Sequence, residues 1–189
     1  SPRHQLAVIE LGASRLGEIA WTSSLARASV VLINNAGLAH AGEFGGPEQV
    51  IRAKGEILDG MAGAGTAVLN LDDPAFTQWR ARNSAGRLGP VSVANGQADV
   101  FARNVIFCSQ GCAAFELCTP AGNARVRLRL AGRHNLANAL AAAATAHAAG
   151  IALADLVHGL EQAQAVAGRC LQHRLSHGGV LIDDSYNAN

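Results

Sequence analysis

Three residues in the first third of the chain have side chains that could hold a metal ion beside a phosphate. Glu10 lies in an apolar run, where an unpaired carboxylate is costly, and His40 follows the apolar segment Ser29–Asn34 after a short loop. Lys54 lies on the apolar side of a helical pattern. Because ligands collect at the carboxyl ends of parallel strands, a carboxylate and an imidazole at two strand ends indicate a cation site. The plainer interpretations are a solvent-facing carboxylate, a loop histidine and a lysine that snorkels to water.

Three further polar segments stand next to apolar ones. Asn70–Asp72 ends an apolar run, Gly132–Asn135 opens an Ala-rich helical pattern, and Asp183–Asn189 follows a second apolar run. The N-terminus of a helix is a good place for the polar groups of a nucleotide. A turn, a helix cap and an acidic loop would have the same compositions. No segment identifies a function by itself.

The elements that position these residues alternate between strand and helix over the first hundred residues. Apolar runs predict strands at Leu6–Leu11, Ser29–Asn34 and Thr66–Leu71. Apolar residues at helical spacing predict helices over Gly17–Ala26 and Pro47–Leu58, the second of which begins with proline. This order predicts an α/β fold with a mostly parallel sheet that is flanked by helices on both faces.

The rest of the chain changes character twice. Between about Leu88 and Leu130, alternating segments broken by turn residues predict an antiparallel β-hairpin subdomain. In it, arginines alternate with apolar residues, which indicates one wet and one dry strand face. Two helices are then expected over Arg133–Ala149 and Leu153–Gln162, the first buried because its alanines allow close packing. Two last strands follow Gly168, so the expected domains are 1–167 and the start of another at 168–189.

Composition excludes several classes of protein. The 189 residues carry a formal net charge of +1, which excludes non-specific binding of nucleic acid through a large positive net charge. Hydrophobic residues make up 49% of the chain, so disorder is not expected, and no apolar run is long enough to span a membrane. The cysteines lack the C-x-x-C spacing of a zinc site. Three of them lie in apolar strand-like surroundings and are expected to be small buried hydrophobes, in a reducing compartment. The cysteines of the chain are Cys108, Cys112, Cys118 and Cys170.

Six segments taken together, in this order and spacing, resemble the Mur ligase family, the ATP-dependent amide ligases of peptidoglycan precursor synthesis. The segments are Glu10–Ala13, Ala39–His40, Ala53–Ile57, Asn70–Asp72, Gly132–Ala139 and Asp183–Asn189. The final Asp-Ser-Tyr-Asn-Ala-Asn run and the segment Gly17–Thr22 are most similar to the member that adds D-alanyl-D-alanine to UDP-N-acetylmuramoyl-tripeptide. The resemblance implies that the chain is the family's central ATP-binding domain.

The resemblance implies ATP and Mg²⁺ as cofactors and an acyl-phosphate intermediate on the substrate. By matching position, Glu10 and His40 are expected to be magnesium ligands. Lys54 resembles the family's carbamylated lysine, in which carbon dioxide turns the amine into a metal-binding anion, and these three are the expected catalytic residues. His134 and Asn135 match the segment that contacts the adenine.

Five other residues are implied to lie near the nucleotide. Arg169 matches an arginine close to it, Asp183 a ribose-contacting aspartate, and Asn187 a residue near the phosphates and the substrate. Asn70 and Asp72 match a turn near the nucleotide.

The chain departs from the family's pattern, most clearly in the phosphate-binding loop, and the family's N-terminal domain and most of its C-terminal domain are not matched. No Gly-x-x-x-x-Gly-Lys-Ser/Thr pattern occurs in the 189 residues, so the phosphate-binding loop is expected to lie in a longer parent protein. The segment alone is therefore expected to be inactive, while the parent is expected to be a cytoplasmic monomer. The alternatives are another Mur-family or folylpolyglutamate-type ligase and a nucleotide-binding module without catalysis.

Overall fold

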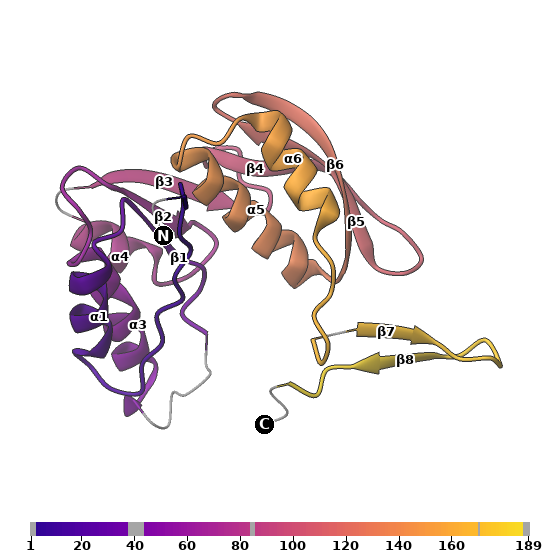
Figure 1. Ribbon diagram of the computed structural model, residues 1–189, viewed down its shortest axis with the longest axis horizontal. Helices are drawn as coiled ribbons and strands as arrows, with labels where there is room; N and C mark the ends of the chain where they lie inside the picture. Colours follow the sequence, from indigo (N-terminus) through magenta and orange to yellow (C-terminus); the bar gives the residue numbers. More distant parts are fainter. Residues whose placement is uncertain (1–2, 38–43, 84–85, 170, 187–189) are drawn as a thin grey trace.

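A six-stranded sheet with helices on both faces forms the body of the protein (Figure 1). The structure is a computed structural model, and it describes residues 3–37, 44–83, 86–169 and 171–186. The spatial order of the strands is β1-β2-β3-β4-β5-β6. The strands are β1 (Val30–Ile33), β2 (Thr66–Asn70), β3 (Arg87–Ser92), β4 (Val100–Phe107), β5 (Cys112–Thr119) and β6 (Gly122–Ala131). The predicted α/β fold is confirmed.

The sheet has a parallel and an antiparallel part. β1, β2 and β3 run parallel, and β3 also pairs in parallel with the start of β4. From β4 to β6 the strands are antiparallel neighbours, so the predicted hairpins begin at β4 rather than at Leu88. On β6, Arg125, Arg127 and Arg129 are exposed while Val126 and Leu128 are buried, which confirms the wet and dry faces.

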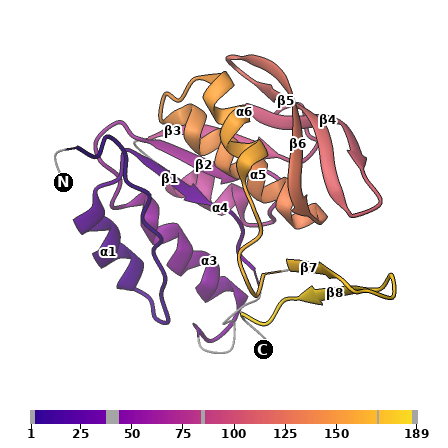
Figure 2. The ribbon, with the colours of Figure 1, turned by 45° about the vertical axis from the view of Figure 1, so that its right-hand side comes forward.

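Helices cover the two faces of the sheet unequally. The helices are α1 (Glu18–Ala26), α3 (Pro47–Gly55), continued by the 3₁₀ turn η1 (Glu56–Leu58), α4 (Phe76–Arg82), α5 (Arg133–Ala148) and α6 (Leu153–Gln162). Turning the view by 45° shows α1 and α3 gathered beside β1, while α6 lies beside the antiparallel strands (Figure 2). α5 contacts all six strands, as its small side chains predict, and Leu140 and Ala143 on it are fully buried.

Side chains that alternate along β2 belong to two hydrophobic clusters on opposite faces of the sheet. Val68 belongs to the cluster that includes Leu140 of α5, whereas Ala67 and Leu69 belong to the cluster that includes Trp79 of α4. All three β2 residues have no solvent exposure. A strand buried on both faces is typical of the parallel part of an α/β sheet, and it explains why this run reads as continuously apolar.

Two sequence predictions are corrected, and one helix is added. Leu6–Leu11 forms no strand: Val8 is fully exposed, and no described strand pairs with this run, so it lacks the ladder that a buried strand needs. The short helix α4 was not predicted. Cys108 is exposed rather than buried, because it stands at a hairpin turn, whereas Cys118 is buried. Cys170 lies outside the described residues.

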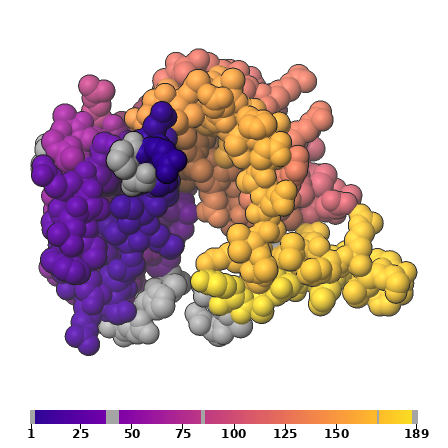
Figure 3. All heavy atoms as spheres, in the orientation of Figure 1, coloured from indigo at the N-terminus to yellow at the C-terminus, as the bar shows by residue number. Residues whose placement is uncertain are grey.

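The C-terminal part forms a separate two-stranded sheet. Its strands are β7 (Leu171–Arg174) and β8 (Val180–Asp183), and they pair antiparallel. In the space-filling view this hairpin is a yellow lobe below the orange helices (Figure 3). Whether it begins a second domain at 168 stays a prediction. Among the described residues, no helix has both the length and the apolar character needed to cross a membrane.

Candidate functional site

The carboxyl ends of β1 and β2 form a polar edge with α5. The Asn70 side-chain amide donates to the carbonyl oxygen of Asn34 at 3.0 Å, and the Asn34 amide donates to Oδ1 of Asn138 on α5 at 2.8 Å. The backbone N–H of Asp72 donates to Oδ1 of Asn70 at 2.9 Å. The three asparagines thus fix the two strand ends to the helix above them, at the edge where α/β sheets bind ligands.

Lys54 reaches this edge from α3. Its Nζ donates to the carbonyl oxygen of Asn35, just beyond β1, at 2.8 Å. Burial lowers the pKa of Lys54 from its ordinary value, and the negative charge of Asp73 opposes that shift. Its neighbours Ala53 and Gly55 are buried. The lysine is therefore a half-buried amine held at the carboxyl end of a strand, and its neutral form is favoured more than on an open surface.

The loops after β1 and β2 are joined by Asp73, which the sequence interpretation did not single out. Its Oδ2 accepts the N–H of Ala36 at 2.7 Å and its Oδ1 accepts the N–H of Ala75 at 2.8 Å. The signal that could have found it is the Asp-Asp-Pro turn at the end of the β2 run, since aspartate before proline favours a turn. Asp73 sets both the shape of the edge and part of the field at Lys54.

Asp72 has structural partners on the next strand. Its Oδ1 accepts the hydroxyl of buried Ser92 at 2.6 Å, and its Oδ2 accepts the N–H of Val93 at 2.7 Å. Both carboxylate oxygens are thus occupied in holding the end of β3. A direct nucleotide contact by Asn70 or Asp72 stays a prediction.

The predicted metal ligands are not brought together in the part of the chain that the structure describes. Glu10 is exposed, and His40 lies outside the described residues. No group of three His, Cys, Asp or Glu side chains in the described ranges could hold a metal ion. Lysine is not one of these residue types, and an amine such as that of Lys54 would bind a metal in this way only after conversion to a carbamate. The three-residue metal site stays a prediction.

The start of α5 presents an open helix N-terminus. Gly132, with φ of 102°, is the N-cap and supplies no side-chain bond to the first turn. The Asn135 amide donates to the carbonyl oxygen of Ala131 at 2.8 Å, and His134 is exposed. The N–H of Asn135 donates to the carbonyl oxygen of Gly132 at 3.1 Å. This leaves the N–H groups of Arg133 and His134 without intrahelical partners, so this end can accept a polar or anionic ligand.

Arg169 and Asp183 lie at the same end of the C-terminal hairpin, where Asp183 pairs with Leu171. The Arg169 guanidinium lies over the ring of Tyr186, 4.4 Å from its centroid, and the N–H of Tyr186 donates to the carbonyl oxygen of Gly168 at 2.9 Å. Asp183 Oδ1 accepts the Ser185 hydroxyl at 2.7 Å, and bonds from Ser185 hold the pKa of Asp183 below its ordinary value. Asn187 lies outside the described residues. These two predicted residues are near each other, but their nucleotide contacts stay predictions.

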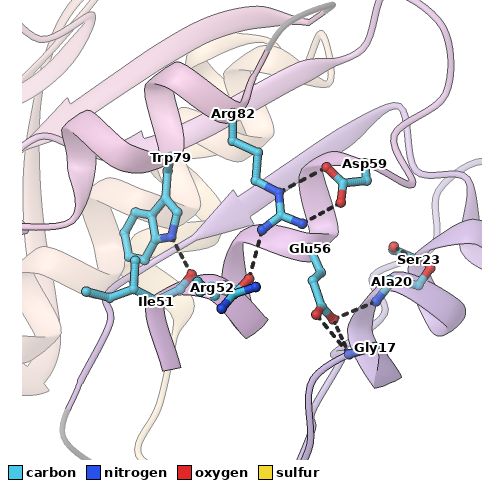
Figure 4. A network of polar contacts seen from close by, with 9 residues as sticks. All are labelled: Gly17, Ala20, Ser23, Ile51, Arg52, Glu56, Asp59, Trp79 and Arg82. Atoms are coloured by element: carbon cyan, nitrogen blue, oxygen red, sulfur yellow. Dashed lines mark hydrogen bonds and ion pairs between the residues drawn. The ribbon is translucent and has the colours of Figure 1, made fainter. Parts of the chain in front are cut away.

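A buried carboxylate fixes the helix that carries Lys54. Glu56, directly after α3, accepts the N–H of Gly17 with both oxygens, at 2.8 and 3.0 Å, and the N–H of Ala20 at 3.1 Å (Figure 4). It therefore caps α1 from another element. Arg82 of α4 bonds both oxygens of Asp59, at 3.0 and 2.6 Å, and ties α4 to η1 in the same view.

We expect Glu56→Gln to lower the free energy of unfolding by about 1–3 kcal/mol, because an amide cannot accept all three N–H donors with the charge of a carboxylate. Glu48→Gln on the exposed face of α3 is the matched control and should change stability little. Urea unfolding of both variants measures the difference. Equal stability of the two variants would show that Glu56 is not the cap that holds α1.

Comparison with known proteins decides the family. The family model described as the Mur ligase middle domain matches residues 1–146. The chain belongs to the Mur ligase family. Among curated relatives in this family, UDP-N-acetylmuramoyl-tripeptide–D-alanyl-D-alanine ligase of Escherichia coli K12 is 42% identical over 189 residues, covering 100% of this chain and 42% of the relative. The Haemophilus influenzae enzyme of the same name is 38% identical, covering 99% and 40%.

Solved Mur ligase structures agree with the sequence relatives. A crystal structure of MurF from Acinetobacter baumannii superposes with a TM-score of 0.93 at 42% identity, covering 100% of this chain and 41% of that one. MurF from Thermotoga maritima in complex with ADP gives a TM-score of 0.78 at 25% identity, covering 95% and 40%. The chain spans about two fifths of the length of these Mur ligases.

Proposed function

We propose that this chain is the central part of an ATP-dependent ligase that adds D-alanyl-D-alanine to UDP-N-acetylmuramoyl-tripeptide in peptidoglycan synthesis. The observation that carries the proposal is the 42% identity over the whole chain to a ligase of that name, together with a TM-score of 0.93 to a MurF structure. The proposal covers a whole protein of which this chain corresponds to about two fifths.

The proposed chemistry activates a carboxylate and then joins it to an amine. The tripeptide carboxylate takes a phosphoryl group to become an acyl phosphate, the D-alanyl-D-alanine amine attacks its carbonyl carbon, and the tetrahedral intermediate releases phosphate. ATP and Mg²⁺, when bound, supply the phosphoryl group and neutralise its charge. The protein therefore needs groups that orient the reactants and stabilise developing charge more than it needs a nucleophile.

The open N-terminus of α5 supports nucleotide binding. Its N-cap supplies no side-chain bond, so the N–H groups of Arg133 and His134 are available to polar atoms of a ligand. In the proposed complex His134 and Asn135 contact the adenine, with Asn135 already oriented by its bond to Ala131. Arg169 is held near the nucleotide by its stacking on Tyr186, and Asp183 and Asn187 approach the ribose and the phosphates.

The half-buried amine of Lys54 supports the metal-binding part of the proposal. Neutral Nζ attacks the carbon of carbon dioxide and loses a proton, which leaves an anionic carbamate at the edge formed by β1 and β2. Burial favours the neutral amine, which is the reactive form. The carbamate oxygens, with Glu10 and His40, would hold the metal with a donor set of the oxygen-rich kind that Mg²⁺ accepts, with one imidazole.

A substrate panel on the complete ligase tests the function. Phosphate release from ATP is measured with UDP-N-acetylmuramoyl-tripeptide and, in turn, D-alanyl-D-alanine and single amino acids, and separately with a folate acceptor and glutamate. We expect release only with D-alanyl-D-alanine. Release with a single amino acid would favour another amino-acid-adding Mur enzyme, release with glutamate and a folate acceptor would favour a folylpolyglutamate synthetase, and ATP binding without release would favour a nucleotide-binding module.

We also propose that the complete ligase is cytoplasmic, as its nucleotide-linked substrate suggests, and that it is a monomer. Size-exclusion chromatography with light scattering measures the oligomeric state directly.

A further inference from the structure

Two thiols face each other across the turn between β4 and β5, away from the polar edge described above. Cys108 follows β4 and Cys112 begins β5, and the register of the hairpin places them opposite each other, next to the Phe107–Ala113 pair. The N–H of Cys108 donates to the carbonyl oxygen of Cys112 at 3.0 Å, and the N–H of Gly111 donates to that of Cys108 at 2.9 Å. The turn is thus closed by backbone bonds on both sides.

This register puts the two sulfur atoms on one face of the hairpin. Opposed residues of an antiparallel pair that shares backbone bonds have Cα atoms about 5.5 Å apart, and a disulfide requires about 4.4–6.8 Å. Their Cβ atoms, about 4.5–5.5 Å apart, are slightly farther than an unstrained bridge prefers. A bridge here is therefore sterically accessible and strained, which makes it easily reduced.

The chemical environments of the two thiols differ. Cys108 is exposed, and the N–H of Gln110 approaches its Sγ at 3.4 Å. This bond, followed by others from Cys112 and Gly111, lowers the pKa of the Cys108 thiol. Burial and the proximity of Cys108 raise the pKa of the Cys112 thiol. Its exposure and lowered pKa suit Cys108 to attack first, with Cys112 beside it to resolve the adduct.

Cys112, one thiol of the pair, borders a pocket beside the turn. Cys112 and Gln110 line a pocket of about 260 Å³, with Arg129 and Ala131 of β6 on one side and Leu171 and Gln172 on the other. Gln172 donates to the carbonyl oxygen of Gln110 at 3.3 Å, so the C-terminal hairpin contacts the turn itself.

We propose that Cys108 and Cys112 are a redox-active dithiol site. They form a reversible disulfide with each other by thiol–disulfide exchange with small-molecule disulfides such as oxidised glutathione. Cys108 thiolate attacks one sulfur of the oxidant, whose S–S bond breaks, and one glutathione thiolate leaves. Cys112 then attacks Cys108 sulfur, and the second glutathione thiolate leaves. The two protons of the protein thiols end on two molecules of glutathione, so the protein is oxidised by two electrons and the oxidant is reduced by two.

Backbone bonds join the turn to the residues that precede α5. The N–H of Gly132 donates to the carbonyl oxygen of Gly111 at 2.9 Å, and Cys112 pairs with Ala131. A bridge that tightens the turn therefore acts on the residues that precede the helix. The dithiol site itself stands whether or not the chain belongs to a ligase of the proposed specificity.

Peptide mapping tests the proposal on the reduced, dilute 189-residue chain. After treatment with oxidised glutathione, the protein is denatured and its free thiols are alkylated. Cleavage after arginine and glutamate separates residues 104–116, which hold both thiols, from 117–125, which hold Cys118. We expect 104–116 to be unalkylated and lighter by two hydrogen atoms, and dithiothreitol before alkylation to restore two alkyl groups. The buried Cys118 should stay alkylated and is the internal control.

Single variants assign the two roles. Cys112→Ser should stop at a glutathione adduct on Cys108, whereas Cys108→Ser should leave Cys112 free for alkylation. The proposal is overturned if wild-type 104–116 keeps two alkyl groups or retains glutathione, or if its thiols pair with Cys118 or with a second chain.

Discussion

Replacing Lys54 by alanine in the complete ligase should lower kcat at least about 100-fold, the scale of one strong electrostatic contribution to a transition state. The variant removes the anion that the proposed carbamate supplies beside the phosphoryl group. Lys54 is the only lysine of this chain, so no neighbouring lysine here can take its place. Steady-state phosphate release at saturating ATP measures the change.

Chemical rescue separates a lost anion from a disturbed fold. Acetate or formate added to Lys54→Ala should restore part of kcat, because a small carboxylate can enter the space that the side chain leaves. Arg52→Ala, an exposed position on the same helix, is the matched control and should keep kcat. Unchanged kcat in Lys54→Ala would remove the carbamate from the mechanism.

The 189-residue chain by itself should release no phosphate above background. Loss of the backbone nest and of the lysine that hold the phosphates, at about 100-fold each, would put its rate at least about 10,000-fold below that of the complete ligase. The physical reason is that no Gly-x-x-x-x-Gly-Lys-Ser/Thr pattern is present, so the backbone nest and lysine that hold the phosphates are lacking. The assay contains ATP, Mg²⁺ and both proposed substrates.

Two controls make that result interpretable. Circular dichroism of the isolated chain should show the helix and strand content of the structure, so that a missing activity is not a missing fold. Titration with ATP and Mg²⁺ should show feeble binding, whereas micromolar binding would favour a nucleotide-sensing module. Turnover near that of the complete ligase would contradict the account of the missing phosphate loop.

Elements with strong local signals were predictable from the sequence. The Ala-rich pattern from Arg133 predicted α5, which the structure ends at Ala148, because alanine has the highest helix propensity and Gly150 stops the helix. The apolar run that became β2 was equally clear. By contrast, Leu6–Leu11 has the composition of a strand, but no described strand pairs with it. A local pattern could not predict this, because it does not show which segment a strand pairs with.

The site was predictable only in part, because its contacts join distant segments. The apolar setting of Lys54 was visible in the sequence, and the structure shows it half-buried. Its partner, the carbonyl oxygen of Asn35, is a backbone group that no residue pattern marks. Asp73 and Glu56 act through bonds to backbone N–H groups of other loops, so their roles depend on tertiary placement. The resemblance to a known family supplied the residue roles that the local patterns could not.

A crystal structure of the complete ligase with Mn²⁺ in place of Mg²⁺, together with ADP, tests the convergence of the metal site most directly. The anomalous signal of Mn²⁺ locates the metal independently of the protein density. The account predicts a peak about 2.0–2.5 Å from ligand atoms of Glu10, His40 and a carbamate on Lys54, with density for three extra atoms beyond Nζ. A bare Nζ, with the metal on other residues and these three side chains on separate surfaces, would contradict it.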